Sequence, residues 1–202
     1  MQKFIYDEYK NRKSIRLKNW DYSTPGCYFV TICVKNMNEI FGIVKNEKMI
    51  LSEIGIIADQ CWQNIPNHYP SARLDEYIVM PNHIHGIIVI DKTALVRVQN
   101  FEPVQGRKIA QIPAVRVQNP EPVRLNKFQH IIPRSLGSII RGFKIGVTEW
   151  SRNNNYIYDV WQRSFHDHII RNEFVLNRIR EYIRDNPKKW PSDRNNPENL
   201  DM

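Results

Sequence analysis

The sequence lacks the features that mark secreted and membrane-spanning proteins. Its 202 residues include only three cysteines, Cys27, Cys33 and Cys61, with no CxxC pair. An odd number of separated thiols argues against a disulfide framework and a thiolate metal site, and it fits a reducing compartment. No run approaches the roughly 18 consecutive apolar residues of a membrane-spanning helix, and the N-terminus has no signal-peptide form. We therefore expect a cytoplasmic protein with no membrane partner.

Nucleotide-binding motifs are also missing. The chain contains neither a Walker-type P-loop nor a dinucleotide-binding glycine fingerprint. The sequence therefore predicts no nucleotide cofactor.

What is present is a basic chain with the composition of a folded protein. Hydrophobic residues make up 42% and there are five tryptophans, so we expect a single domain over residues 1–202. The net charge of +8 favours a polyanionic partner. Basic residues alternate with aromatic ones, as in Arg141-Gly142-Phe143-Lys144, which suits contacts to the phosphates and bases of a single strand. The alternative is a solvated charged surface beside ordinary core aromatics.

Two histidines stand at the start of an apolar, β-branched run, His83-Ile84-His85-Gly86-Ile87-Ile88-Val89-Ile90. Side chains alternate along a strand, so His83 and His85 should share one face while Ile84 points to the other. Two neighbouring imidazoles form half of a site for a divalent metal. The alternative is that the pair only makes hydrogen bonds or lies half exposed, because a two-residue motif is weak until other ligands are found.

A helix is predicted over residues 172–186. Asn172 is a suitable N-cap, apolar residues follow with the helical period, and Pro187 should end the helix. Tyr182 and Asn186 are four residues apart, so they should lie on one face. The alternative is that Tyr182 is a core aromatic with its hydroxyl in water and that Asn186 caps the helix.

Three segments together carry a resemblance to a known family. Met80–His85, Val160–His168 and Tyr182–Pro187, in this order and spacing, resemble the HUH single-tyrosine transposases, which are the insertion-sequence-200-like family. Within that family the chain is similar to the REP-associated tyrosine transposases, from about Asn19 to Trp190. The resemblance implies a catalytic Tyr182 and a divalent metal, Mg or Mn, held by His83, His85 and Asn186. Many insertion-sequence relatives carry glutamine where this chain has the shorter Asn186.

The resemblance also implies the chemistry. Tyr182 would attack a DNA phosphate, form a covalent 5′-phosphotyrosine and leave a free 3′-hydroxyl, so that the enzyme would act as nuclease and strand transferase on single-stranded or hairpin DNA. A tyrosine hydroxyl is a weak nucleophile at neutral pH, and a metal would help by offsetting charge on the phosphate. Two alternatives stay open: a domesticated hairpin-binding protein without mobilising activity, and a metal-dependent phosphoesterase that uses water. Whether the protein forms a homodimer is also left open.

Further candidates for DNA contacts lie outside the predicted metal site. Arg163 and His168 belong to the second resembling segment, and Arg141 and Lys144 belong to a predicted helix. Each has a simpler alternative as an ordinary surface or hydrogen-bonded side chain. The Phe165-His166-Asp167-His168 segment is a second HxH motif, but no third ligand accompanies it.

The pattern of strands and helices predicts an α+β fold, a sandwich of helices packed on an antiparallel sheet. The resemblance implies its ferredoxin-like version, with the histidine strand central. The predicted elements are strands at 27–34, within 40–51, at 74–80 and at 83–90, helices at 52–65, 135–151 and 173–185, and an extended segment at 161–170.

Two irregular regions complete the domain. Residues 1–20 are predicted to form a basic N-terminal arm. Residues 91–130 are predicted to be a flexible insertion because of their prolines and scattered polar residues, and Val96–Val104 recurs there as Val115–Val123. Two copies are too few for a solenoid, so we expect a tolerated surface loop. The alternative is that this segment, with seven Lys and Arg against three Asp and Glu, adds contacts to phosphates.

Overall fold

The protein folds around a four-stranded antiparallel sheet, with strands in the spatial order β4-β5-β1-β6. The computed structural model describes residues 17, 20–91, 132–193 and 195–199. The sheet strands are β1 (Gly26–Cys33), β4 (Ala72–Val79), β5 (His83–Ile90) and β6 (His166–Ile170). The main helices are α2 (Glu53–Gln63), α4 (Leu136–Asn153) and α5 (Glu173–Lys189).

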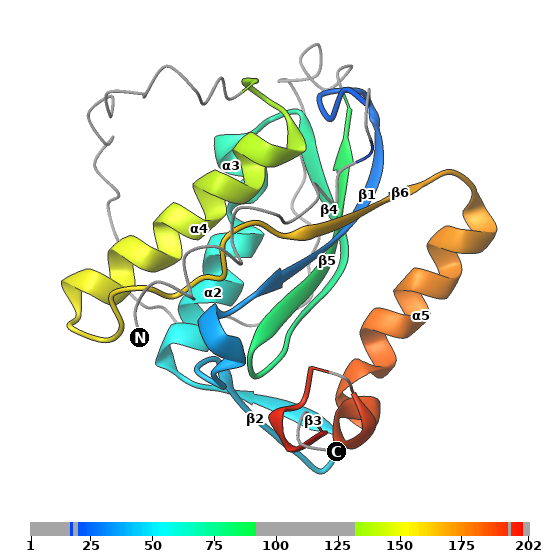
Figure 1. Cartoon of the computed structure of the whole chain (residues 1–202). Coiled ribbons are helices and arrows are strands. Elements are labelled where there is room, and N and C mark those ends of the chain that lie inside the picture. Colours follow the sequence, from blue (N-terminus) through cyan, green and yellow to red (C-terminus); the bar gives the residue numbers. More distant parts are fainter. Residues whose placement is uncertain (1–16, 18–19, 92–131, 194, 200–202) are drawn as a thin grey trace, which may run out of the picture.

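The connectivity of these elements is ferredoxin-like. Helix α2 connects β1 to β4 through the short α3 (Ile65–His68), and α4 lies between β5 and β6, which gives the order β-α-β-β-α-β. Strand β5 has neighbours on both sides, as expected for the histidine strand. The predicted α+β fold is therefore confirmed (Figure 1).

A separate two-stranded sheet branches from the chain after β1. It consists of β2 (Gly42–Lys45) and β3 (Lys48–Leu51), within the predicted strand pair. The remaining elements are the short 3₁₀ helices η1 (Lys35–Met37), η3 (Trp190–Ser192) and η4 (Pro197–Asn199). Among the helices in the described part of the chain, none combines the length and the apolar composition needed to cross a bilayer.

Helices α2 and α4 cover one face of the sheet and enclose the main core. From β5, Ile84 and Ile88 point into this core, where they join Trp62 of α2 and Phe143 of α4. Gly86 lies between the two isoleucines, and a Cβ there would collide with the Trp62 ring. The glycine therefore lets the largest core side chain lie directly against the central strand.

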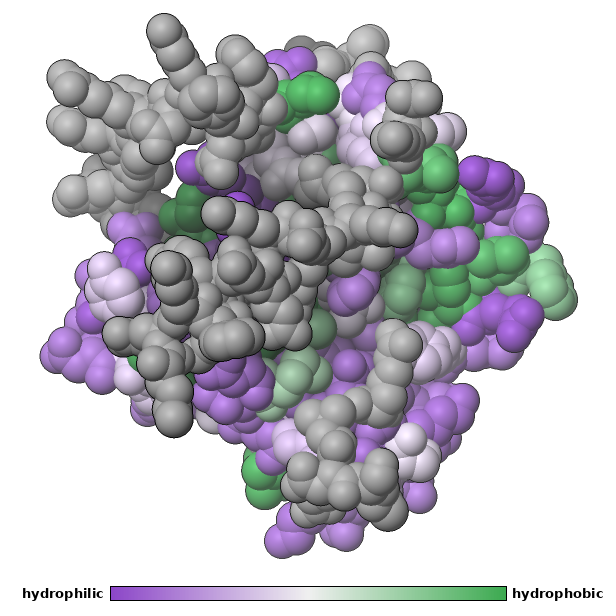
Figure 2. All heavy atoms as spheres, in the orientation of Figure 1, coloured by the Kyte–Doolittle hydropathy of each residue, from purple (hydrophilic) through white to green (hydrophobic). Residues whose placement is uncertain are grey.

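Helix α5 packs against the opposite face (Figure 1). The buried cluster beneath it is small and consists of Ile87, Ile170 and Ile183, with partly buried neighbours around them. Figure 2 shows that hydrophilic residues cover much of the visible surface, while apolar residues gather on the right, near the N-terminal half of α5 in the matching view of Figure 1. Phe174 in that half of α5 is exposed.

Two predicted boundaries were wrong. Helix α5 starts after the predicted N-cap, Asn172, whose Oδ1 accepts from the Val175 amide at 2.9 Å, but it continues through Pro187 to Lys189. A proline only removes one amide donor and crowds one preceding turn, which a helix tolerates near its end. The segment predicted as extended over 161–170 becomes a sheet strand only at His166, because Ser164 has a left-handed backbone conformation (φ 80°).

The two irregular regions fall largely outside the described residues. Of the predicted arm at 1–20, only Leu17 and Trp20 are described, and of the predicted insertion at 91–130, only Asp91. The repeat itself lies outside the described residues.

Candidate active site

His83 and His85 lie side by side on the α5 face of the central strand. Both are buried, and their ring centroids are 4.4 Å apart. They point away from Ile84, which belongs to the core on the other face, as strand alternation predicts.

Asn82 fixes the tautomer of His83. Its Nδ2 donates to the carbonyl oxygens of Met37 at 3.0 Å and Asn195 at 2.7 Å, which leaves its Oδ1 facing His83 Nδ1 at 2.8 Å. An amide oxygen only accepts, so His83 Nδ1 carries the proton. In the neutral ring Nε2 then keeps its lone pair, which is the form in which an imidazole binds a metal.

His85 has polar neighbours at both ring nitrogens. Its Nδ1 lies 2.9 Å from Thr31 Oγ1, on the strand residue directly across from it, and its Nε2 lies 3.1 Å from the Tyr182 hydroxyl. The Phe29 ring stacks on His85, with centroids 5.4 Å apart. The ring is therefore held in place by β1 and faces α5 with Nε2.

Helix α5 brings Tyr182 and Asn186 to the histidines. The Tyr182 ring lies 5.1 Å from the His85 ring, and the Trp190 ring lies 5.9 Å from the His83 ring. Asn186 is one turn after Tyr182 and one turn before Trp190, so it occupies the same helix face between two residues that each contact a histidine. The predicted grouping of Tyr182 and Asn186 on one face thus agrees with the geometry.

Asn186 is an unusual buried amide. Its side chain is 0% exposed, yet neither its Oδ1 nor its Nδ2 has a hydrogen-bond partner among the described residues. Leaving such a group unsatisfied costs about 1–3 kcal/mol, so an orphaned amide in a folded protein calls for an explanation. One explanation is that the Asn186 oxygen binds a cation, because an amide oxygen can coordinate a metal ion.

These residues fit a small metal site. The described residues contain no cluster of three or more His, Cys, Asp and Glu side chains that could hold a metal. Among the described residues, the amide oxygen of Asn186 is available as a third donor beside the two imidazoles. Imidazole and amide oxygen together suit a first-row divalent cation such as Mn²⁺ better than Mg²⁺, which prefers oxygen ligands.

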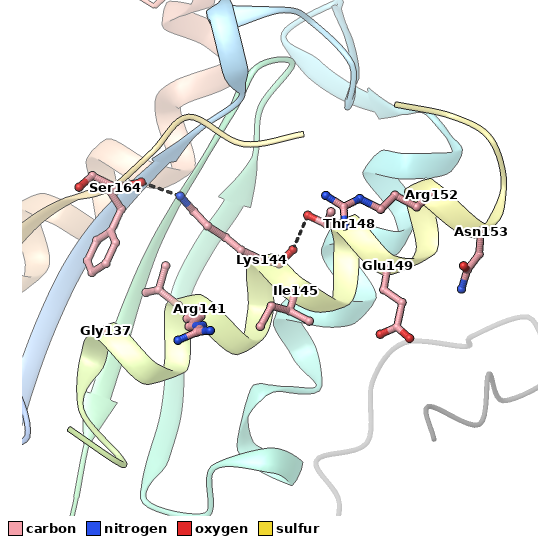
Figure 3. Close-up of a pocket in the computed structure, with 11 residues that line it drawn as sticks. Gly137, Arg141, Lys144, Ile145, Thr148, Glu149, Arg152, Asn153 and Ser164 are labelled. Atoms are coloured by element: carbon pink, nitrogen blue, oxygen red, sulfur yellow. Dashed lines mark hydrogen bonds between the residues drawn. The ribbon is translucent and has the colours of Figure 1, made fainter. Parts of the chain in front are cut away.

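The four predicted DNA contacts come from other elements than the cluster, namely strand β6, the loop before it and helix α4. His168 stands opposite Phe29 on the edge strand β6, on the α5 face, and is exposed. Arg163 is exposed in the loop before β6. Arg141 and Lys144 line a groove of about 590 Å³ along α4, on the other side of the sheet (Figure 3).

Lys144 is the most constrained of the four. Its Nζ donates to the backbone oxygens of Gln162 at 2.9 Å and Ser164 at 2.6 Å, and burial lowers its pKa to about 8. Both bonds tie α4 to the loop that carries Arg163. Among the described residues that line the groove, Lys144 and Arg152 both donate to backbone oxygens of the protein, whereas Arg141 has no such bond.

Comparison with known proteins gives the family. No protein-family model matches the chain. Over 190 residues the chain is 42% identical to an uncharacterised protein of Haemophilus influenzae, with 91% of this chain and 92% of that protein covered. The chain belongs to the family of that protein.

Two solved structures resemble the fold. A REP-associated tyrosine transposase bound to a REP hairpin superposes with a TM-score of 0.52 and 15% identity, over 86% of this chain and 73% of that one. A proposed transposase from Deinococcus radiodurans gives a TM-score of 0.41 and 11% identity, over 84% of this chain and 95% of that one. At 15% identity the first likeness shows a shared fold.

Three side chains that shape the cluster were missed in the sequence. Asn82 orients His83, Thr31 contacts His85, and Trp190 packs on His83. Asn82 stands next to the HxH motif and could have been suspected. Thr31 had no local signal, because its role depends on the register between β1 and β5, which the sequence does not reveal.

Proposed function

We propose that this protein is a DNA transposase-like nuclease and strand transferase of the HUH single-tyrosine class, similar to the REP-associated tyrosine transposases. The observation that carries the proposal is the Tyr182 hydroxyl at 3.1 Å from His85 Nε2, beside His83 and the orphaned amide of Asn186. Tyr182 is the only one of these side chains that is substantially exposed, at 38%, so a substrate can reach it.

In the proposed reaction the Tyr182 oxygen attacks a phosphorus atom of the DNA backbone. The bond from phosphorus to the upstream 3′-oxygen breaks, the 5′-phosphate stays on the tyrosine, and the upstream strand leaves with a 3′-hydroxyl. Attack by another 3′-hydroxyl reverses the step and joins the strands without hydrolysis.

His83, His85 and Asn186 are the proposed ligands of a divalent cation, Mn or Mg. When bound, the cation supplies positive charge beside the scissile phosphate. His85 Nε2 can bind a metal only in the neutral tautomer that carries its proton on Nδ1, and its single lone pair then could not also accept from the Tyr182 hydroxyl. If His85 held a cation, the Tyr182 hydroxyl would no longer be bonded to this ring and would be available to the phosphate.

The substrate is proposed to be single-stranded or hairpin DNA. The net charge of +8 and the proposed contacts at Arg163, His168, Arg141 and Lys144 support a polyanion. The structural neighbour that was solved with a REP hairpin supports the choice of a hairpin. All four residues are proposed to contact DNA, and Lys144 also holds the loop that carries Arg163.

The proposal is tested with labelled hairpin oligonucleotides from the DNA that flanks the gene, in buffer with Mn²⁺. The wild type should cut one strand and give a protein–DNA band on a denaturing gel, whereas Tyr182→Phe should bind the DNA but give neither product. The matched control is Tyr158→Phe, which removes the hydroxyl of an exposed tyrosine on a distant loop and should behave as wild type. Cleavage without a covalent band would favour the phosphoesterase, and binding without cleavage would favour the hairpin-binding protein.

A further inference from the structure

Apolar side chains of α5 pack on the sheet, with Ile183 buried and Val175, Leu176 and Ile179 partly buried. The buried anchor of the helix, Ile183, meets Ile87 and Ile170 of the sheet. Tyr182 is 38% exposed, so burial contributes little to fixing its position. A shift of the helix by about 1 Å would be enough to misalign a nucleophile. Apolar contacts are non-directional, so a directional contact between α5 and the sheet would define the register of the helix more closely.

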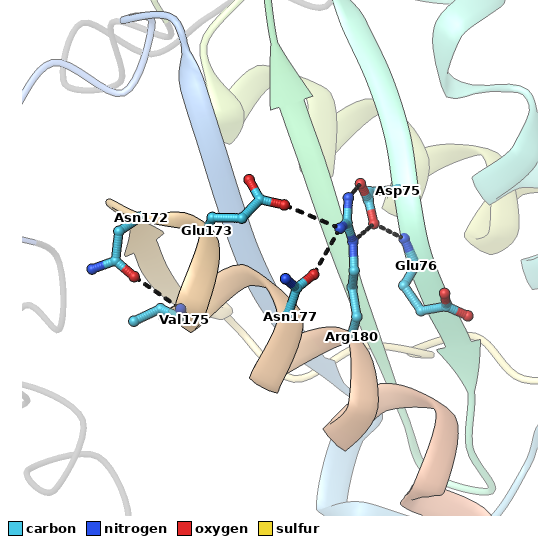
Figure 4. Close-up of polar contacts among 7 residues, drawn as sticks. All are labelled: Asp75, Glu76, Asn172, Glu173, Val175, Asn177 and Arg180. Carbon is cyan, nitrogen blue, oxygen red and sulfur yellow. Dashed lines mark hydrogen bonds and ion pairs between the residues drawn. The ribbon is translucent and has the colours of Figure 1, made fainter.

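An ion pair between α5 and β4 is placed to do so. Arg180 donates to both carboxylate oxygens of Asp75, from Nε at 2.8 Å and from Nη2 at 2.6 Å (Figure 4). Arg180 Nη1 donates to Asn177 Oδ1 at 3.0 Å, and it lies 3.9 Å from a Glu173 carboxylate oxygen. Two parallel bonds fix both the distance and the angle of the guanidinium, and the two contacts within α5 orient the arginine on its own helix.

Asp75 stands at an irregularity of β4 that presents it to α5. Leu74 pairs with Ile88 and Tyr77 pairs with Gly86, so two residues of β4 oppose the single Ile87. This extra residue is a β-bulge, which re-aims side chains at a sheet edge. Asp75 Oδ1 also accepts from the Glu76 amide at 2.7 Å, which orients the carboxylate before α5 is considered.

The pKa shifts of both side chains agree with a charged, hydrogen-bonded ion pair. The hydrogen bond from Arg180 holds the pKa of Asp75 below its usual range, and the same bond raises the pKa of Arg180. The side chain of Asp75 is 21% exposed and that of Arg180 is 30% exposed, so water screens the charges of the pair only partly.

Arg180 does not belong to the histidine cluster itself. It lies two residues before Tyr182, and residues two apart point in different directions around a helix. Any effect of Arg180 on the reaction must therefore act through the position of α5. We propose that Arg180 and Asp75 are positioning residues, a latch that sets α5 on the sheet so that the Tyr182 hydroxyl meets the histidines; this proposal rests on the proposed role of Tyr182.

The test compares Arg180→Gln and Asp75→Asn with Arg178→Gln, a matched control. Arg178 is an exposed arginine of the same helix whose guanidinium lies over the Phe174 ring at 5.8 Å and makes no ion pair among the described residues. Both latch variants should exchange the amide hydrogens of α5 faster, with β5 still protected. Their rate of strand cleavage should fall by about tenfold to a hundredfold, while the Kd for the hairpin stays unchanged. Arg178→Gln should change neither.

A conservative variant separates positioning from general stability. Arg180→Lys keeps the charge but cannot reproduce the two parallel bonds of the planar guanidinium, so its cleavage rate should fall between the wild type and Arg180→Gln. The proposal is overturned if both latch variants cleave at the wild-type rate, or if exchange rises equally in α5 and β5. Hydrogen exchange is measured without DNA, so it tests the effect of the latch on α5 even if the protein does not cleave DNA. A wild type that fails to cleave would contradict the proposed function alone.

Discussion

The two faces of the sheet differ in what they bury, and β5 shows the difference residue by residue. Ile84 and Ile88 point into a large apolar core between the sheet and helices α2 and α4. His83 and His85 point the other way, into a cluster of imidazole, hydroxyl and amide groups under α5. One strand therefore contributes to the apolar core on one side and carries the candidate active site on the other.

The comparison shows how a site that lowers the free energy of unfolding can persist in a folded domain. A buried amide such as that of Asn186, which has no hydrogen-bond partner in the described part of the chain, destabilises the native state. The apolar core on the opposite face supplies burial free energy that does not depend on the cluster. Mutations on the two faces should therefore have different consequences, and the following changes test that separation.

The largest effect on folding should come from the core face. Ile84→Ala removes a fully buried side chain from the main cluster and should lower the free energy of unfolding by about 2–5 kcal/mol, as measured in urea. The control Ile43→Ala truncates an isoleucine that is exposed on β2 and should change stability by about 0.5 kcal/mol or less. If the two variants lose equal stability, the core assignment is wrong.

A smaller effect should come from His83 on the other face. If His83, His85 and Asn186 hold a cation, Mn²⁺ at about a hundredfold above its Kd should stabilise the wild type by about 2.7 kcal/mol. His83→Ala should fold but lose this stabilisation and the cleavage activity, and chelator should abolish cleavage by the wild type. His168→Ala, which truncates an exposed histidine on the same side of the sheet, should keep the Mn²⁺ effect. Full cleavage in chelator would argue against the metal.

The Arg180–Asp75 pair should contribute less, and its contribution should depend on pH. The folded-state pKa of Asp75 is lowered, so the contribution is fully present above the unfolded pKa of about 3.9 and is lost as the pH falls through the folded pKa. At neutral pH, Asp75→Asn should cost about 1 kcal/mol or less, because the pair is partly exposed. Urea unfolding at decreasing pH should show the wild type and the variant converging below about pH 4. A difference that persists in acid would mean that the carboxylate charge is not responsible.

The smallest effect should follow removal of the insertion. Replacing residues 93–126 by a short Gly/Ser linker should preserve folding and metal-dependent cleavage, because loop length changes the closure entropy only slowly. Thermal unfolding and the hairpin cleavage assay would check this. Loss of cleavage in a folded variant would assign the insertion to the DNA-binding surface.

Local patterns predicted most of the fold, and the errors have local causes. The alternation around His83 and the helical spacing of Tyr182 and Asn186 depend only on nearby residues, and the structure agrees with both. The end of α5 was misjudged because a proline in the last turn is tolerated. The start of β6 was misjudged because the left-handed Ser164 is held by Lys144 from a distant helix, a contact with no sequence signal.

The partners of the candidate site were harder to predict. Thr31 meets His85 only through strand register, and Asp75 meets Arg180 only because a bulge turns it toward α5. Pairings between residues 54 and 105 positions apart cannot be read from local periodicity. The sequence can therefore indicate which residue types carry chemistry, while the arrangement around them requires the fold.

The central claim is that Tyr182 becomes covalently joined to DNA, and one measurement tests it directly. After reaction with a hairpin substrate and digestion of the DNA, trypsin should release the peptide Glu181–Arg184, in which Tyr182 is the only hydroxyl-bearing residue. The account predicts that mass spectrometry finds this peptide with a nucleotide attached through phosphate to Tyr182. Cleaved DNA with this peptide always unmodified, or a nucleotide attached to another peptide, would contradict the account.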